Sequence, residues 1–167
     1  MIFEFRIKCK DEKNNFALTI LVDENQTFLD FHNSIYMCSS FETTQMTSFF
    51  ISDDDWNRGT EITLMEVDDK IPSMEKTKVN ELVNNKGDKL LYLFDFFSDR
   101  FFKIELVNII DKNNKKQLPL CTQAAGEAPQ QIIIDTELDE LLNDEYDSSD
   151  DYDDENIGFE NIDDLDI

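Results

Sequence analysis

Apolar and polar residues alternate along the first part of the chain, as is typical of β-strands. Phe3, Phe5 and Ile7 fall on one side of such a strand, and Phe16–Val22 repeats the alternation after the polar residues 11–15. Two strands joined by a short polar segment predict a β-hairpin at the N-terminus.

An amphipathic helix is predicted next, over about residues 28–38. Apolar positions recur there every three or four residues, as a helical face requires: Phe28, Phe31, Ile35 and Cys38. Thr27 stands just before this run and Asp30 follows it by three residues, which is a short version of the capping box. The helix is therefore expected to begin directly after Thr27.

Two more strand pairs and a second, short helix follow. Met46–Ile51 and Glu61–Val67 are β-rich and flank an acidic loop at 53–59, so they predict a second hairpin. Leu90–Phe96 and Phe101–Val107 predict a third one, joined through residues 97–100.

Between the second and third hairpins, Val79, Leu82 and Val83 share one helical face, and Gly87 is the expected C-terminal cap. The resulting order is β-β-α-β-β-α-β-β. The predicted fold class is α+β: a mixed, largely antiparallel sheet of hairpins with two helices packed on it. The run 132–134 is a weaker candidate for an edge strand, and Leu138, Leu141 and Leu142 are candidates for one helical turn.

Charge divides the 167-residue chain unevenly. All 15 basic residues lie at or before Lys116, whereas 17 of the 38 acidic residues follow it. Residues 135–167 contain 16 acids and no base, and 13 of the 14 Phe residues precede them. Segments of this composition repel themselves and bury little apolar surface. The sequence thus predicts a folded domain over 1–134 and a mostly disordered acidic tail over 135–167.

The same composition excludes several classes of function. A pI of about 4.1 opposes direct nucleic-acid binding, which needs clustered Lys and Arg. No apolar run approaches the roughly 20 residues of a membrane span, and no signal-peptide stretch is present, so we expect a cytoplasmic protein. Cys9, Cys38 and Cys121 form no Cys-x-x-Cys pair, and no cofactor is expected.

Three segments, in this order, resemble the plasmid pRiA4b ORF-3-like family over roughly residues 1–131. Thr27–Ile35, which contains His32, is similar to the first helix of that family. Tyr92–Phe96 resembles its strand with an aromatic-Asp-Phe core, here Asp95 and Phe96. The third segment runs from Pro119-Leu120-Cys121 to Gly126-Glu127-Ala128-Pro129 and looks like the Pro-x-Cys segment of typical members.

The chain departs from the family pattern at two places. Phe97-Ser98 stands where typical members have Gly-Asp, and Gln130-Gln131 stands where they have Pro-Glu or a similar pair. The resemblance implies a mixed sheet with helices packed on it and a link to plasmids and other mobile elements. It implies no established reaction.

Asp53, Asp54 and Asp55 are the candidate metal ligands, because adjacent carboxylates offer the hard oxygen atoms that Mg²⁺ and Ca²⁺ prefer. The competing and favoured interpretation is an acidic turn, since Asp is common in turns and neighbouring side chains on a strand point to opposite faces. We therefore assign no metal site and keep the triplet as a weak candidate.

His32 is the only histidine, so any Ser-His-Asp or Cys-His catalytic pair would need it as the base. A structural histidine at the margin of the helix's apolar face is the favoured interpretation, and we assign no catalytic residue. Asp95 lies between two Phe residues on a predicted central strand, where a carboxylate must be paired or hydrogen-bonded. Arg100 is its expected partner, with Asp99 as a companion in the same loop.

The tail carries the clearest interaction signal. Apolar side chains punctuate its acidic background: Ile157, Phe159, Ile162, Leu165 and Ile167. Acidic segments with this pattern often become ordered on a partner. The primary hypothesis is a non-catalytic interaction protein whose tail binds a basic protein partner, and a purely solubilising tail is the alternative for this segment. Two other hypotheses are a metal-dependent enzyme or nuclease accessory using Asp53, Asp54 and Asp55, and a nucleic-acid mimic that occupies a DNA-binding cleft.

Overall fold

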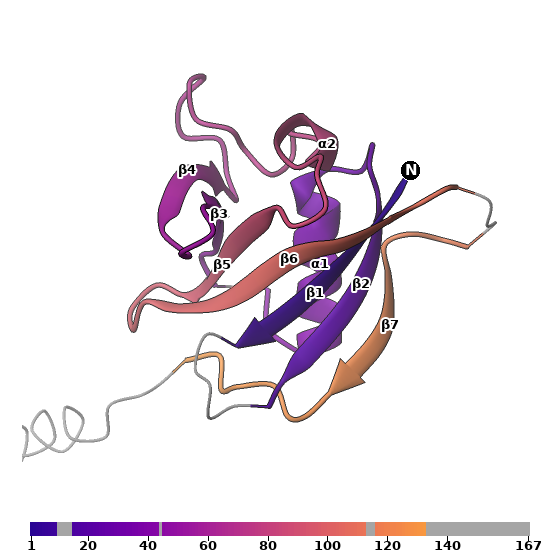
Figure 1. Ribbon diagram of the computed structural model, residues 1–167. Helices are drawn as coiled ribbons and strands as arrows, with labels where there is room; N and C mark the ends of the chain where they lie inside the picture. Colours follow the sequence, from indigo (N-terminus) through magenta and orange to yellow (C-terminus); the bar gives the residue numbers. More distant parts are fainter. Residues whose placement is uncertain (10–14, 44, 113–115, 133–167) are drawn as a thin grey trace, which may run out of the picture. The chain divides into compact units, whose positions relative to one another are not determined.

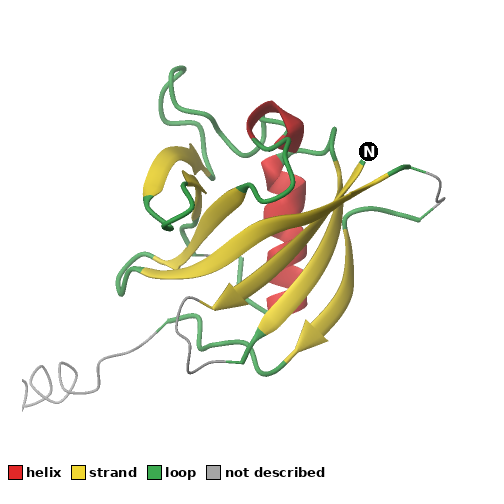
Figure 2. Cartoon of the chain, in the orientation of Figure 1, coloured by secondary structure: helices red, strands yellow, loops and turns green. Residues whose placement is uncertain are grey.

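The computed structural model describes residues 1–9, 15–43, 45–112 and 116–132, and contacts group Met1–Ile133 into one unit. The described part contains seven strands and two helices: β1 (Ile2–Cys9), β2 (Ala17–Asp23), α1 (Phe28–Ser39), β3 (Ser48–Ser52), β4 (Arg58–Thr63), α2 (Val79–Leu82), β5 (Lys89–Asp95), β6 (Arg100–Ile110) and β7 (Leu120–Ala125). The strands form a single sheet in the order β4-β3-β5-β6-β1-β2-β7, and every neighbouring pair is antiparallel (Figures 1 and 2). The α+β class predicted from the sequence is confirmed.

The predicted N-terminal hairpin is present as β1 and β2. Phe5 lies opposite Ile20 in this pair, and both side chains are fully buried. On its other side β1 pairs with β6, which joins the first hairpin to the third one. The alternation that predicts the strands therefore also predicts which of their faces enters the core.

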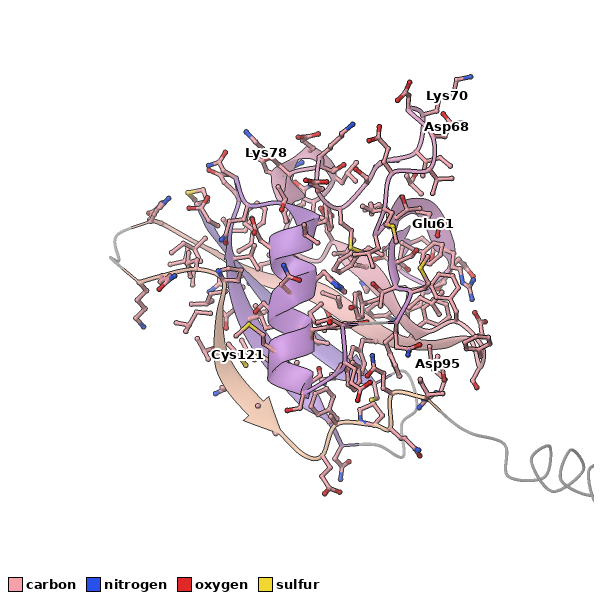
Figure 3. All side chains as sticks on the ribbon, turned by 180° about the vertical axis from the view of Figure 1, so that it is seen from behind. Glu61, Asp68, Lys70, Lys78, Asp95 and Cys121 are labelled. Atoms are coloured by element: carbon pink, nitrogen blue, oxygen red, sulfur yellow. The ribbon has the colours of Figure 1, made fainter. Side chains whose placement is uncertain are left out.

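Helix α1 begins where the capping box places it. The Asp30 N–H donates to the Thr27 hydroxyl at 3.2 Å, and the Thr27 N–H donates to the Asp30 carboxylate at 3.1 Å. The helix ends at Ser39, and Ser40 follows in the left-handed conformation with φ of 55°. Figures 1 and 3 show α1 lying along one face of the sheet.

The main core fills the space between α1 and the sheet. Phe31 of α1 stacks on Phe5 of β1 at 4.6 Å between ring centroids and on Phe49 of β3 at 5.4 Å. All three rings are fully buried. Burying an aromatic side chain of this kind contributes about 1.5–3 kcal/mol, so this aromatic contact fixes the helix on the sheet.

The opposite face of the sheet carries a second, smaller apolar cluster. Its members are Phe50, Leu91, Leu93 and Phe101. No helix of the described part covers them. Instead Trp56 packs against the cluster, and the Arg58 guanidinium lies 4.3 Å from the Phe101 ring centroid and 5.3 Å from that of Phe50. Long side chains thus shield this face where the other face has a helix.

Two predicted boundaries are wrong. The strand expected at Glu61–Val67 is β4 at Arg58–Thr63, and Met65 and Val67 are exposed in the loop that follows. The predicted helix at 79–83 is only the four-residue α2, which ends at Leu82 with Val83 as its C-cap. Gly87 is therefore not the helix cap. It lies at φ of 97° in the turn before β5, where its N–H donates to the Leu106 carbonyl.

The last strand lies elsewhere than the sequence indicates. The edge strand next to β2 is β7, Leu120–Ala125, whereas Ile132 lies in a bend; Ile133 and Ile134 are outside the described residues, as are Leu138, Leu141 and Leu142. The half-buried or exposed side chains of β7 show no alternation of burial that the sequence pattern could reveal. Within the described ranges, no helix is long and apolar enough to cross a bilayer.

Candidate functional site

The acidic triplet forms a tight turn between β3 and β4. The Asp53 carboxylate accepts hydrogen bonds from the backbone N–H groups of Asp55 and Asn57, both at 2.9 Å, and from the Asn57 side chain at 2.9 Å. These hydrogen bonds lower the pKa of Asp53. The Asp54 carboxylate instead pairs with Lys89 at 3.0 Å. The carboxylate of Asp53 thus serves the turn and that of Asp54 an ion pair, and the residues that the structure describes include no group of three His, Cys, Asp or Glu side chains placed to hold a metal.

His32 lies inside the core rather than at its margin. Its side chain is 4% exposed, and Nδ1 lies 2.7 Å from the Tyr92 hydroxyl oxygen and 3.3 Å from that of Thr47. Burial lowers the pKa of His32 to about 4, so the ring is neutral at pH 7. Burial likewise raises the pKa of Tyr92 well above its usual value. We call His32, Tyr92 and Thr47 the buried polar cluster.

Two partly buried cysteines, Cys38 of α1 and Cys121 of β7, lie close enough for their thiols to interact. Figure 3 shows Cys121 beside the helix, and both thiols are free. Burial is the main cause that raises the pKa of the Cys38 thiol to about 12, and Cys121 adds to it. A thiol in this state is a poor nucleophile, since the reactive species is the thiolate. Cys38 is therefore unsuited to pair with His32 in nucleophilic catalysis.

Asp95 is buried and paired, as the sequence predicts. Its carboxylate, 1% exposed, accepts from Arg100 Nε at 2.9 Å and from the Ser98 N–H at 3.2 Å. The predicted companion Asp99 instead forms an ion pair with Arg58 of β4. Arg100 therefore compensates the negative charge of Asp95, and Asp99 takes no part in this ion pair.

Arg100 also ties the last described segment to the sheet. A second nitrogen of its guanidinium donates to the carbonyl of Gln130. The side chain of the neighbouring Gln131 makes two hydrogen bonds to the backbone of Glu42. It accepts from the Glu42 N–H at 2.8 Å and donates to the Glu42 carbonyl at 2.9 Å. We call the contacts of Asp95, Arg100 and Gln130, together with the Gln131–Glu42 pair, the β5–β6 junction. It fastens residues 130–131 to the turn after β5 and to the loop after α1.

The family-like positions divide between two ends of the sheet. Asp95 belongs to the β5–β6 junction, and His32 belongs to the buried polar cluster. Phe96, which is 44% exposed, follows Asp95 in the turn. Pro129 is half-buried and directly precedes the segment held by Arg100. At the other end of the sheet, Pro119 directly precedes β7, and Cys121 is the second residue of that strand.

An open pocket of about 390 Å³ lies at this far end, next to Pro119. It is lined by Asp23, Asn25, Gln26, Lys112, Lys116 and Leu118. Lys112 binds Asp23 and is the main cause that lowers the pKa of this carboxyl, and the Gln26 side chain donates to the Leu118 carbonyl at 2.7 Å. The polar groups of the pocket are thus largely engaged with one another.

The remaining predicted site residues fall beyond the described part of the chain. They are the tail positions Ile157, Phe159, Ile162, Leu165 and Ile167. The structure also brings together residues that sequence analysis did not connect with one another, above all Tyr92 and Thr47 around His32. These partners lie 60 and 15 residues from His32, so no local spacing could reveal them.

Comparison with known proteins places the chain in a family. The profile of the plasmid pRiA4b ORF-3-like proteins matches residues 1–158, so the protein belongs to this family. The match extends beyond the 1–131 expected from the motifs. No curated protein matches the chain. Among solved structures, it is similar to a protein of unknown function from Methanosarcina mazei Go1, with a TM-score of 0.65 and 23% identity over 90% of this chain and 84% of the other. At that identity the likeness establishes the fold alone.

Proposed function

We propose that this protein is a non-catalytic interaction protein that binds a basic protein partner through its C-terminal segment, residues 135–167. One observation carries the proposal: this segment has 16 acids and no base, and its last 11 residues include five large apolar ones, Ile157, Phe159, Ile162, Leu165 and Ile167. A dense negative charge attracts a basic surface at long range, and apolar side chains add specificity at contact.

The folded part supports a binding role over a catalytic one. His32 is neutral and enclosed, Asp95 is saturated by Arg100, and Asp53 is held by its own turn. A general base has to reach a proton of the substrate, and these groups are engaged by other parts of the protein. For the metal-dependent alternative, which uses Asp53, Asp54 and Asp55, the carboxylates of Asp53 and Asp54 would have to give up the contacts described above.

The partner's chemistry follows from the segment's composition. A complementary surface would present Lys and Arg around an apolar groove wide enough for Phe159, Ile162 and Leu165. A nucleic-acid mimic would act on a basic DNA-binding cleft and would need charge far more than these apolar residues. The family's description links it to a plasmid, and a role in the cytoplasm of a cell that carries mobile elements is part of the proposal.

Affinity capture from the native host tests the proposal. Three baits are compared: the full chain, a chain ending at Ile134, and the full chain with Phe159→Ala, Ile162→Ala and Leu165→Ala. We expect a basic protein on the full chain only. Equal capture by all three baits would refute the proposed function, and loss with truncation but not with the triple substitution would favour the mimic.

A further inference from the structure

The face of the sheet opposite α1 gathers basic side chains on a strongly acidic protein. Arg6 and Lys8 lie on β1, Lys103 lies on β6 and Lys89 lies on β5. Their register places them together: Lys8 is directly opposite Lys103, and Arg6 is opposite Glu105, which is opposite Lys89. Residues directly opposite each other project to the same face. Figure 1 views this face, with α1 behind the sheet.

Three of these cations form no ion pair in the described part of the protein. Lys89 pairs with Asp54, but no salt bridge within 4.0 Å engages Arg6, Lys8 or Lys103 among the described residues. Glu105 is the nearest acid in register and lies between two bases. Like charges directly opposite on neighbouring strands destabilise a sheet, so the Lys8 and Lys103 pair carries a cost that an anion would remove.

One aromatic side chain borders these cations. The Lys103 ammonium lies 5.2 Å from the Trp56 ring centroid, and that of Lys89 lies 5.7 Å from it. The half-buried Trp56 therefore holds two ammonium groups at the edge of the second apolar cluster. Arg6 and Lys8 are exposed on the neighbouring strand.

We propose that this basic face, Arg6, Lys8, Lys103 and Lys89, is a docking site for an extended acidic peptide of a partner protein. Arg6 and Lys8 are two residues apart on one strand, a spacing of about 6.6–6.8 Å. Carboxylates at alternate positions of an extended peptide repeat at the same interval. A strand-like acidic peptide lying along β1 thus places two of its alternate carboxylates at Arg6 and Lys8, with Lys103 beside Lys8 on the neighbouring strand.

The face is less suited to nucleic acid. Single strands bind by stacking bases on exposed aromatic rings, whereas Phe50 and Phe101 are 9% and 2% exposed beneath the Arg58 side chain. A polyphosphate chain also needs many neutralising cations, whereas this face supplies only Arg6, Lys8, Lys89 and Lys103. A short acidic peptide needs only the local cations, since screening limits other charges to about 8–10 Å at ordinary salt.

Titration of the full-length protein with a synthetic peptide of alternating Glu and Thr tests this site, with a peptide of alternating Gln and Thr as the uncharged probe. Backbone amide shifts in an NMR experiment report the position of binding. We expect shifts on β1, on β6 and at the start of β5 around Lys89, and an affinity that falls at least about tenfold when Lys8→Gln and Lys103→Gln are combined. That variant should also melt at the same or a higher temperature than the unchanged protein.

A second pair of lysines provides the matched control. Lys70 and Lys86 are exposed in loops, and Figure 3 shows Lys70 projecting from a loop well away from the helix. Lys70→Gln with Lys86→Gln removes the same charge and should change the affinity less than about twofold. Equal losses with both pairs, shifts that fall mainly outside β1, β5 and β6, or tighter Lys8-dependent binding of oligothymidylate than of the Glu peptide would each overturn the proposal.

Discussion

Arg100 and Asp95 form an ion pair across the tight turn between β5 and β6, in which the carboxylate is buried and the guanidinium side chain is 24% exposed. Removing one partner of such a pair leaves a charge without compensation inside the protein. We expect Arg100→Ala to lower the free energy of unfolding by about 3–5 kcal/mol, measured by urea denaturation.

Asp99→Asn is the matched control for that change. Asp99 pairs with Arg58 on the surface, where its side chain is 64% exposed, and Asn tolerates its positive φ of 53°. Exposed pairs contribute about 0–1 kcal/mol, so the variant should unfold almost as the unchanged protein does. Similar losses for Arg100→Ala and Asp99→Asn would show that the Asp95 pair does not hold the junction.

The buried His32 predicts a pH dependence of stability. Its pKa is lowered from 6.5 to about 4 in the folded protein, so between these values the unfolded chain binds a proton that the folded protein does not. The contribution of His32 to the free energy of unfolding should therefore decrease as the pH drops from about 6.5 to about 4. Below about pH 4 this contribution should not change further. The difference corresponds to about 3 kcal/mol.

His32→Gln isolates that contribution, because it keeps a polar side chain near Tyr92 but does not titrate. Carboxyl groups titrate in both proteins, so the loss between pH 7 and pH 4 should be smaller in the variant. An NMR titration that gave His32 a pKa near 6.5 would contradict the enclosed ring described here.

Because Asp53, Asp54 and Asp55 form a turn, we expect divalent metal ions to leave the stability of the protein unchanged. Asp53→Asn with Asp55→Asn weakens hydrogen bonds within the turn, and we expect the protein to fold with a slightly lower melting temperature. Mg²⁺ or Ca²⁺ at modest excess should leave the melting temperature of the unchanged protein where it is. A metal-dependent rise that the double variant lacked would restore the enzyme hypothesis.

The elements that the sequence predicts well are those whose signal is local. The Thr27 and Asp30 capping box locates the start of α1, and alternating burial locates β1 and β2. Strand β7 is not predicted from the sequence, because its side chains are half-buried or exposed and apolar and polar residues do not alternate along it. It is recognisable only from its pairing with β2, about 100 residues earlier in the chain.

The candidate site shows the same division. Arg100 follows Asp95 by five residues, so their pairing is within the reach of sequence reasoning. The enclosure of His32 depends on Tyr92 and Thr47, which other strands and loops supply, and the basic face depends on the pairing of β1 with β6. The helical pattern around His32 indicates its position at the margin of a face but not what packs over it.

A chain ending at Ile134 should fold by itself. The buried aromatic residues described above all precede this point, and the acids beyond it add mainly repulsion. We expect its urea denaturation to match that of the full chain or to show a slight gain in stability. A loss of several kcal/mol would mean that residues 135–167 contribute packing to the folded domain.

The most direct test of the proposed function is the affinity of the captured basic partner for tail variants, measured at two salt concentrations. Phe159→Ala should weaken binding at least about tenfold at fixed salt, since burying such a side chain is worth roughly 1.5–3 kcal/mol. Exchanging several acids of Asp147–Glu155 for amides should mainly slow association, and this effect should fade at about 1 M salt, where the screening length is about 3 Å. If Phe159→Ala, Ile162→Ala and Leu165→Ala together left the affinity unchanged, the segment would not be the ligand that we propose.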